Sequence, residues 1–516
     1  MRHHEPPRPL HIALFSIVLV ALAFLLQARI GFTYSDEGFL WYGAVQTLAG
    51  ETPIRDFQSY DPGRYYWSAF WMAAFGESVL ALRGAVALFQ LLGVVSGLLV
   101  LRRAVPSWRV LVPVGFLLIV WMSPRYYRMF EISASLIALH FAVTLIERPT
   151  LRRHFVTGVF TGLAAFFGRN LGLYSLATFG LLIVFVWFRL DRADLFKRLV
   201  YWSLGIAAGY SPMLIMLLAV PGFYESVVAS VVEIGDRGAT NITLPIPWPW
   251  IPDYAQMSLQ NAAHVFSTGF LFLWMPAFYL AAAGIVLRSS VARLRNRVVL
   301  LAGLAVGVMY IHYAFSRADL EHLLVATPVM LISLAALPLD HWGNRAKQGH
   351  RVLLVAFAVL TLFSAGMKSP LYLKATAPAA AFVQYEVRGS DLWIPVPGAK
   401  LLETIERINR EVVPEDEGFL IAPYLCALYG VLERQSPLRE LYFTDQKSTE
   451  SEQATIARLV KKRVNWVLLG NVQLHEQSVS RFRVTHPLLW EHLRTDFSKV
   501  DVAGLRHSFS LLKRNE

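Results

Sequence analysis

Charged side chains are scarce in this chain of 516 residues. They make up 16% of it, whereas soluble domains usually carry about 25%. Hydrophobic residues account for 55%, and they include 33 Phe, 20 Tyr and 14 Trp. This composition argues against an ordinary soluble domain and favours a membrane protein with aromatic residues at both bilayer surfaces.

Acidic residues are fewer than basic ones, 36 against 48, which gives a net charge of +12. An excess of positive charge can indicate nucleic-acid binding. Here the Lys and Arg residues lie in short loops between apolar segments rather than on one basic face. We therefore exclude a nucleic-acid partner, and interpret these cations as the ones that orient membrane helices.

Cysteine is almost absent, because Cys426 is the only one. An intramolecular disulfide is impossible and a cysteine-based metal site is excluded. We predict no cofactor, and dependence on a divalent metal stays open. The first apolar run is followed by no small-residue cleavage site, so we interpret it as a retained span rather than a signal peptide.

Long apolar segments dominate the first two thirds of the chain. A helix needs about 20 mainly apolar residues to cross a bilayer. The sequence predicts an α-helical polytopic membrane protein with about 11 transmembrane helices, at residues 11–28, 79–101, 108–123, 130–146, 154–168, 172–188, 199–220, 265–287, 298–315, 323–339 and 351–367.

The positions of Arg and Lys predict how these helices are oriented. If the N-terminus is cytoplasmic, most cations between spans fall on the cytoplasmic side. The outer side then holds the loop at residues 29–78, a second long loop at 221–264 and everything after Met367. We expect this orientation, in the inner membrane of a bacterium, with the C-terminal region periplasmic or extracellular.

The loop after the first span contains an acidic motif. Ser35 can cap a helix that begins at Asp36 and ends before Gly50, which places Asp36 and Glu37 in its first turn. The helix dipole favours ionised carboxylates there, and a general base has to be ionised. Acids are costly beside a membrane, which indicates a functional site, although acids are also common at any helix start.

Asp61 is predicted to be the N-cap of a second helix in the same loop, with Pro62 in the first position of that helix. Its sequence, GRYYWSAFWMAAF, is short and aromatic on most sides, which is typical of a helix lying in the bilayer interface. Arg64 lies in its first turn.

The segment MYIHYAFSRADLEHLL, between the ninth and tenth spans, is rich in polar groups for a short connection. Arg binds phosphate through paired hydrogen bonds, and His adds a further donor. The alternative is a surface ion pair of Arg317 with a nearby acid, which would contribute little. The density of polar groups favours a substrate site, with four candidates: His312, Arg317, Asp319 and His322.

Few cations are expected in the outer loops, so each one there indicates an anionic partner. That partner is either a phospholipid head group or a lipid-linked phosphate substrate. Together with the acids, these cations suit group transfer from a lipid phosphate, in which a carboxylate deprotonates an acceptor hydroxyl and cations stabilise the departing phosphate. The cations are Arg64, Arg125, Arg128 and Arg169.

Beyond the last span the composition changes, because charged residues return and apolar runs shorten. We predict a transmembrane catalytic domain at residues 1–367 and an extracytoplasmic soluble α/β domain at 368–516. No catalytic residue is expected in the latter. Its predicted elements are helices at 399–412 and 452–462 and strands at 418–424, 464–470 and 505–512.

The architecture and the opening motif resemble the GT-C glycosyltransferases. The likeness is to the branch containing the protein O-mannosyltransferases and the lipid A aminoarabinose transferase. It is carried by YSDEGFLWYGAVQTLAGETP followed by YDPGRYYW, an acidic motif and then a second acid beside Pro.

The resemblance implies transfer of a sugar, with inversion, from a polyprenyl-phosphate donor on the outer face of the membrane. It implies Asp36 as the base, with Glu37 as its supporter or alternative. Asp61 matches the second acid, and SRADLEHLL resembles the loop for the donor phosphate. The acceptor is a lipid, a glycan or a protein.

Two other classes of protein have to be weighed. A transporter or flippase of lipid-linked glycans would place charged groups near the bilayer midplane and often contains inverted repeats. Here the charges gather at the ends of the spans and no repeat is visible. A scaffold protein would not need two acids exposed beside the membrane. The sequence favours the enzyme.

Overall fold

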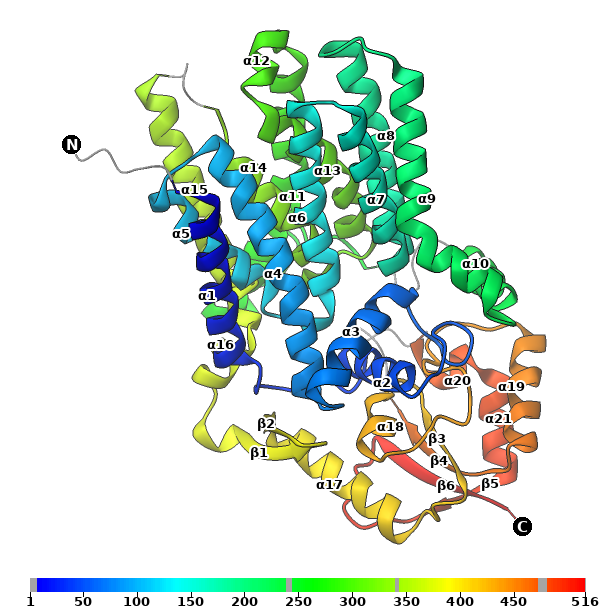
Figure 1. Cartoon of the computed structure of the whole chain (residues 1–516). Helices are drawn as coiled ribbons and strands as arrows, with labels where there is room; N and C mark the ends of the chain where they lie inside the picture. The colour runs from blue at the N-terminus through cyan, green and yellow to red at the C-terminus, as the bar shows by residue number, and fades with distance from the viewer. Residues whose placement is uncertain (1–6, 238–243, 339–342, 472–479, 516) are drawn as a thin grey trace. The chain divides into compact units, whose positions relative to one another are not determined.

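The long apolar segments of the sequence are helices in the computed structural model of the chain (Figure 1). The structure describes residues 7–237, 244–338, 343–471 and 480–515. In this part of the chain, eight helical stretches are long and apolar enough to cross a membrane, and the chain is an integral membrane protein. They are α1 (Pro9–Gln27), α4 (Val79–Ala104), η1 (Tyr126–Arg128) with α6 (Met129–Glu147), α8 (Arg169–Arg189), α9 (Leu195–Ala219), α11 (Leu259–Leu287), α13 (Val298–Ser316), and α15 (Asn344–Ser364) with η3 (Gly366–Lys368).

The other three predicted spans are shorter helices. α5 (Trp108–Met122) and α14 (Leu320–Ala335) are apolar but have only 15 and 16 residues, and α7 (Leu151–Phe167) has 17. A single extended residue, Gly168, separates α7 from α8. All eleven predicted segments are therefore helical, and the number that cross the bilayer stays a prediction.

The chain divides into two compact units. Unit 2 contains the loop after the first span together with the region after the last one, although more than 290 residues separate them in the sequence. The predicted domain boundary between residues 367 and 368 stays a prediction. Unit 1 comprises residues 1–28, 83–216 and 242–376, and unit 2 comprises residues 29–82, 217–241 and 377–516.

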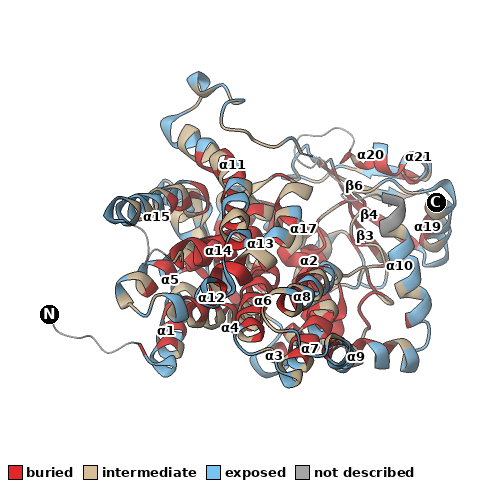
Figure 2. Ribbon diagram, turned by 90° about the horizontal axis from the view of Figure 1, so that it is seen from above, coloured by how far each residue is buried: buried red, intermediate tan, exposed pale blue. Residues whose placement is uncertain are grey.

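The buried centre of unit 1 is formed by α6, α13 and α14 (Figure 2). In α14 every residue from Leu323 to Ala335 is buried. On α9 and α15, by contrast, apolar side chains such as Ile215 and Val355 are exposed. This pattern is expected of helices whose outer faces contact lipid rather than water.

Two helices of unit 1 approach each other through glycines. Gly158 and Gly162 of α7 face Gly205 and Gly209 of α9. A Cβ atom at any of the four would overlap the backbone of the facing helix. Glycines spaced four residues apart allow membrane helices to pack backbone to backbone, and both α7 and α9 have this spacing.

Unit 2 contains both predicted helices of the loop after the first span. α2 (Asp36–Leu48) begins with the two acids, and Gly50 adopts the left-handed conformation expected after its end, with φ of 97°. α3 (Pro62–Phe75) begins at the predicted proline. The side-chain cap predicted at Ser35 is wrong. Its backbone (φ −90°, ψ −99°) lies outside the extended region that a capping residue adopts, and its side chain makes no capping hydrogen bond.

The predicted loop at residues 221–264 contains a helix that the sequence analysis missed. α10 (Phe223–Arg237) follows α9 after a short turn and exposes Tyr224 and Val231 on its surface. α11 also begins at Leu259, earlier than predicted. Polar residues interrupt both segments, so neither was recognised by its apolar length.

The C-terminal part of unit 2 is an α/β arrangement around a four-stranded sheet with the order β3-β4-β6-β5. β3 and β4 are parallel, and the two other pairs are antiparallel. The predicted helices and strands are confirmed, with β6 a few residues later than expected. They are α17 (Val396–Glu411), β3 (Gly418–Ala422), α19 (Thr449–Lys461), β4 (Val464–Gly470) and β6 (Phe509–Arg514).

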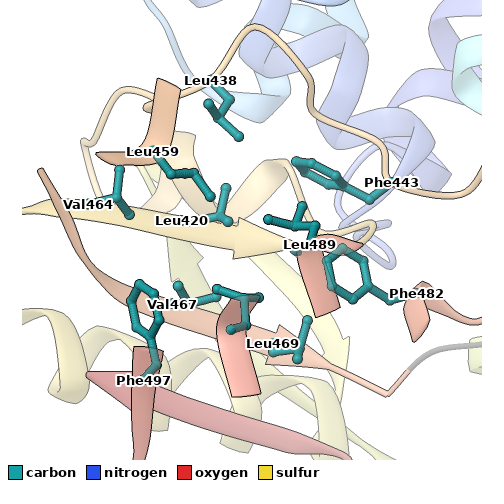
Figure 3. Close-up of a cluster of buried hydrophobic side chains, with 12 residues drawn as sticks. Leu420, Leu438, Phe443, Leu459, Val464, Val467, Leu469, Phe482, Leu489 and Phe497 are labelled. Carbon is teal, nitrogen blue, oxygen red and sulfur yellow. The ribbon is translucent and has the colours of Figure 1, made fainter. Parts of the chain in front are cut away.

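Apolar side chains from one face of this sheet and from its helices form one core (Figure 3). Leu420 of β3 and Val467 of β4 are fully buried in it, and Phe443 comes from the long connection before α19. The elements that the sequence analysis did not anticipate are β1 (Phe382–Val387), β2 (Ser390–Pro395), α18 (Ala427–Val431), α20 (Phe482–Thr485), α21 (Pro487–Asp496) and β5 (Phe497–Val500). The remaining short elements are η2 (Tyr254–Gln256), α12 (Val291–Arg295), α16 (Pro370–Thr376) and η4 (Ala379–Ala381).

Candidate active site

The two acids at the start of α2 have different environments. Glu37 is buried, with 3% of its surface exposed, and its Oε2 accepts a hydrogen bond of 3.2 Å from the backbone N–H of Thr33. Asp36 is half-buried. Asp36 is thus the more exposed acid of the pair.

Two tyrosine hydroxyls from the C-terminal region approach the Asp36 carboxylate. Tyr424 Oη donates a hydrogen bond to Oδ2 at 3.2 Å, and Tyr442 Oη donates to Oδ1 at 3.5 Å. Burial and the nearby Asp36 charge raise the pKa of both phenols well above the ordinary value. At neutral pH both hydroxyls are therefore protonated donors.

Aromatic rings surround this carboxylate. Phe39 stacks on Tyr442 with ring centroids 4.5 Å apart, and Tyr424 lies against the other tyrosine at 4.6 Å. Tyr60 contacts Phe39 edge-on at 5.2 Å. We call Asp36, Phe39, Tyr60, Tyr424 and Tyr442 the acid–aromatic cluster. It combines an ionisable oxygen pair with flat apolar faces.

The predicted residues Asp61 and Arg64 lie beside this cluster. The Arg64 guanidinium sits over the Tyr60 ring, 4.6 Å from its centroid, although only 4% of Arg64 is exposed. Asp61 is buried and precedes α3, but its side chain makes no capping hydrogen bond. The structure therefore brings Asp36, Asp61 and Arg64 to one region of unit 2.

The loop between α2 and α3 is joined to the segment that carries Tyr442. Gln58 Oε1 accepts hydrogen bonds from the backbone N–H groups of Leu441 (2.8 Å) and Tyr442 (2.9 Å). Arg439 Nε donates to the Ile54 carbonyl at 2.7 Å. Ile54 has a φ of 74°, which is unfavourable for a β-branched residue and is maintained by these contacts.

A second group of polar side chains lies in unit 1, between η1 and the start of α14. Arg125 Nε forms an ion pair of 2.7 Å with Glu321 Oε1, and Tyr127 Oη donates to the other oxygen of that carboxylate. Arg128 donates to the hydroxyl of Tyr313 on α13. Two arginines that precede α6 are thus connected to α13 and α14.

The connection between α13 and α14 continues this group. Arg317 Nε lies 2.9 Å from Asp319 Oδ2, and His322 Nδ1 lies 2.7 Å from Asp319 Oδ1. Burial by itself raises the pKa of Asp319, but the hydrogen bonds and charge of His322 and the charge of Arg317 outweigh burial and hold this pKa at about 2. The Tyr313 ring contacts His322 at 5.2 Å, which links the two sets of ion pairs.

The other two candidate residues of unit 1 are His312 and Arg169. His312 Nδ1 lies 3.0 Å from Tyr174 Oη, and the Tyr174 ring contacts Tyr313 at 6.2 Å. Arg169 begins α8. We define the cation cluster by its charged members, which are Arg125, Arg128, Arg317, Asp319, Glu321 and His322.

The cation cluster brings three guanidinium groups together with the carboxylates of Asp319 and Glu321. The ion pair of Arg317 that the sequence left as an alternative is present, but its side chains are only 19% and 13% exposed. Partly buried guanidinium groups are suited to binding an oxyanion.

Sequence reasoning missed the two tyrosines of the C-terminal region. Tyr442 lies in a long connection with no pattern of its own. Tyr424 could have been found from the sequence, because it follows a buried strand, and the carboxyl ends of parallel strands commonly carry functional residues. Among the residues that the structure describes, no three His, Cys, Asp or Glu side chains are close enough to hold a metal ion.

No family model and no curated protein matches the chain. Two solved structures of ArnT from Cupriavidus metallidurans resemble it over nearly the whole length of both chains. The structure bound to undecaprenyl phosphate has a TM-score of 0.57 and 15% identity, and covers 97% of this chain and 97% of ArnT. The apo structure has a TM-score of 0.54 and 14% identity, with coverage of 96% and 97%. The chain therefore has the fold of ArnT. The architecture that the sequence resemblance predicted for this chain, membrane helices with a small C-terminal sheet region, is confirmed.

Proposed function

We propose that this chain is a membrane glycosyltransferase that moves a sugar from a polyprenyl-phosphate donor to an acceptor hydroxyl. The observation that carries the proposal is the half-buried Asp36 at the start of α2, in a chain with the fold of ArnT. One of the ArnT structures is bound to undecaprenyl phosphate, which supports a lipid phosphate as the donor.

Asp36 is the proposed general base. Its carboxylate takes the proton of the acceptor hydroxyl while the hydroxyl oxygen attacks the anomeric carbon, and the bond from that carbon to the phosphate oxygen breaks. Attack opposite to the leaving group inverts the anomeric carbon. Glu37 supports the base by holding the turn at Thr33, and the flat rings beside Asp36 are suited to a sugar face.

The cation cluster is the proposed site for the donor phosphate. Breaking the sugar–phosphate bond leaves a polyprenyl phosphate with increased negative charge. Guanidinium groups stabilise this charge through paired hydrogen bonds. The three partly buried arginines of the cluster support that role. Within the cluster we propose Arg125, Arg128 and Arg317 as phosphate ligands and His322 as an additional donor. His312, outside the cluster, is a second proposed donor.

We further propose the topology that the loop charges predict, with the N-terminus cytoplasmic and both clusters on the outer face of a bacterial inner membrane. The acceptor is a lipid, a glycan or a protein. Asp61, Arg64 and Arg169 are proposed substrate contacts.

The first test is donor turnover by purified protein in nanodiscs, supplied with a panel of polyprenyl-phosphate sugars. We expect the wild type to release polyprenyl phosphate, and Asp36→Asn to lose about a hundred-fold or more of this activity, because a positioned base commonly contributes that much. Asp501→Asn is the control, since it removes a carboxylate of the same unit that is 96% exposed.

Three results would change the proposal. If Glu37→Gln abolished turnover and Asp36→Asn did not, the base would be Glu37. If both variants matched the wild type, the acidic motif would be structural. Transport of a lipid-linked sugar across liposomes without any turnover would instead favour a flippase.

A further inference from the structure

The C-terminal region reaches the acidic motif at two places. The backbone N–H of Ala427 donates to the Tyr34 carbonyl at 3.0 Å, two residues before Asp36. Gly38 of α2 lies against Ala427 so closely that a Cβ atom on the glycine would overlap it. This contact sets α18, and with it the residues after β3, directly on the first turn of α2.

The second place is the segment before α19. Gln58 receives hydrogen bonds from two consecutive N–H groups of this segment, and its own N–H donates to the Arg439 carbonyl at 2.7 Å. Tyr442 is therefore positioned by hydrogen bonds between its own segment and Gln58, in the loop between α2 and α3. Its ring is held in addition between Phe39 and Tyr424.

We propose that Tyr424 and Tyr442 are positioning residues for Asp36, which hold its carboxylate ionised and correctly oriented for proton transfer. The inference rests on the proposed function of Asp36 as a base. It also assigns a role in catalysis to the C-terminal region, where the sequence indicated none.

The effect on Asp36 follows from the two phenol donors and the two carboxylate oxygens that they bind. Each phenol donates to a different carboxylate oxygen, so both oxygens are fixed and the plane of the group is set. A carboxylate accepts about four hydrogen bonds, so it can bind an acceptor hydroxyl in addition to the two phenols. Donors that bind the ionised form favour it over the protonated form. Asp36 would then stay deprotonated at a lower pH than an isolated carboxylate beside aromatic rings.

The test compares pH profiles of kcat/KM for the wild type, Tyr424→Phe, Tyr442→Phe and the double variant. We expect the acid limb to move up by about one pH unit in each single variant and by about two in the double variant, since a hydrogen bond to a charged group is worth roughly a ten-fold change in the ionisation constant. We expect kcat to fall about ten-fold at neutral pH, with the KM for the donor changed less than about two-fold.

Tyr385→Phe is the matched control. Its hydroxyl donates to Glu406 Oε2 at 2.7 Å, so the variant also removes a tyrosine–carboxylate hydrogen bond from unit 2, between β1 and α17. The control should keep the acid limb and kcat of the wild type. If Tyr424→Phe and Tyr442→Phe behave like Tyr385→Phe, the positioning role is overturned.

A second measurement does not need turnover. The apparent melting temperatures of Asp36→Asn, Tyr424→Phe and their combination form a double-mutant cycle at pH 7. Non-additive effects support the contact, and additive ones overturn it. If the wild type turns over a donor and Asp36→Asn does not, while the cycle is additive and the acid limb is unchanged, only this inference fails. If no donor is turned over but the cycle is non-additive, the proposed function fails and the contact stands.

Discussion

At the scale of the residue, Asp319 carries several interactions in the cation cluster. Its Oδ1 accepts a hydrogen bond of 2.9 Å from the backbone N–H of His322, and this bond caps α14. The same oxygen lies 2.7 Å from Nδ1 of the His322 ring. Its other oxygen pairs with Arg317. A charged group with this many partners is stabilised in its ionised form, which is why the pKa of Asp319 lies at about 2.

The low pKa predicts how stability depends on pH. The folded pKa of about 2 lies below the ordinary value of 3.8, so ionised Asp319 stabilises the fold above about pH 4 by about 2 kcal/mol, and this contribution is lost as the pH falls toward 2. Asn caps helices as well as Asp does. We therefore expect Asp319→Asn to lower the apparent melting temperature at pH 7, and the difference from wild type to shrink between pH 4 and pH 3.

Melting in detergent, followed at several pH values, measures this difference. Asp501→Asn provides the baseline, because its exposed carboxylate has little to lose. A difference for Asp319→Asn that stays constant from pH 7 to pH 3 would mean that the charge of this residue does not stabilise the fold.

At the scale of the element, the crossing of α7 and α9 depends on the absence of side chains. Each glycine of the two pairs faces backbone atoms of the other helix. Membrane helices gain little from apolar burial against each other, because lipid tails are equally apolar, so close packing is the main source of their association.

We therefore expect Gly162→Ala and Gly205→Ala to destabilise the protein, by about 1–3 kcal/mol each, because a methyl group forces the helices apart. Gly284→Ala on α11 is the control. Nothing lies within 4 Å of a Cβ atom there, and alanine is the better helix former. Apparent melting temperatures in one detergent compare the three, and equal values would show that the crossing tolerates the extra methyl groups.

At the scale of the whole molecule, unit 2 is assembled from distant parts of the chain. The first turn of α2 packs on α18, and the loop after α2 pairs with residues near Tyr442. Residues 29–82 thus obtain much of their packing from residues 377–516.

Truncation after Thr376 tests this dependence. We expect the backbone amides of α2 to exchange with deuterium much faster in the truncated protein than in the whole chain, because the burial of α2 residues such as Trp41 and Phe39 requires the missing region. The amides of α7 serve as the internal reference, since α7 belongs to unit 1. Equal protection of α2 in both proteins would contradict the assembly.

The sequence predicted well wherever a pattern is local. The apolar length of the spans, the acids and prolines at the starts of α2 and α3, and the buried strand β4 each depend on neighbouring residues. It failed where the cause is not local. Ser35 was expected to cap α2, but its backbone is set by the surrounding turn. β1 and β2 were not predicted, because exposed residues interrupt their apolar pattern. In the structure their turn, Arg388-Gly389, has the two positive φ values of a tight hairpin.

The sequence by itself determined that this protein is a helical membrane protein, and it predicted Asp36 as the base of the proposed active site. Long apolar segments with few charged residues are stable as helices in lipid, so composition and segment length were enough for the first conclusion. Tertiary structure alone decided which residues surround Asp36. Tyr424 and Tyr442 reach it from nearly 390 and just over 400 residues away, through contacts of α18 and of the segment before α19 that no local pattern encodes.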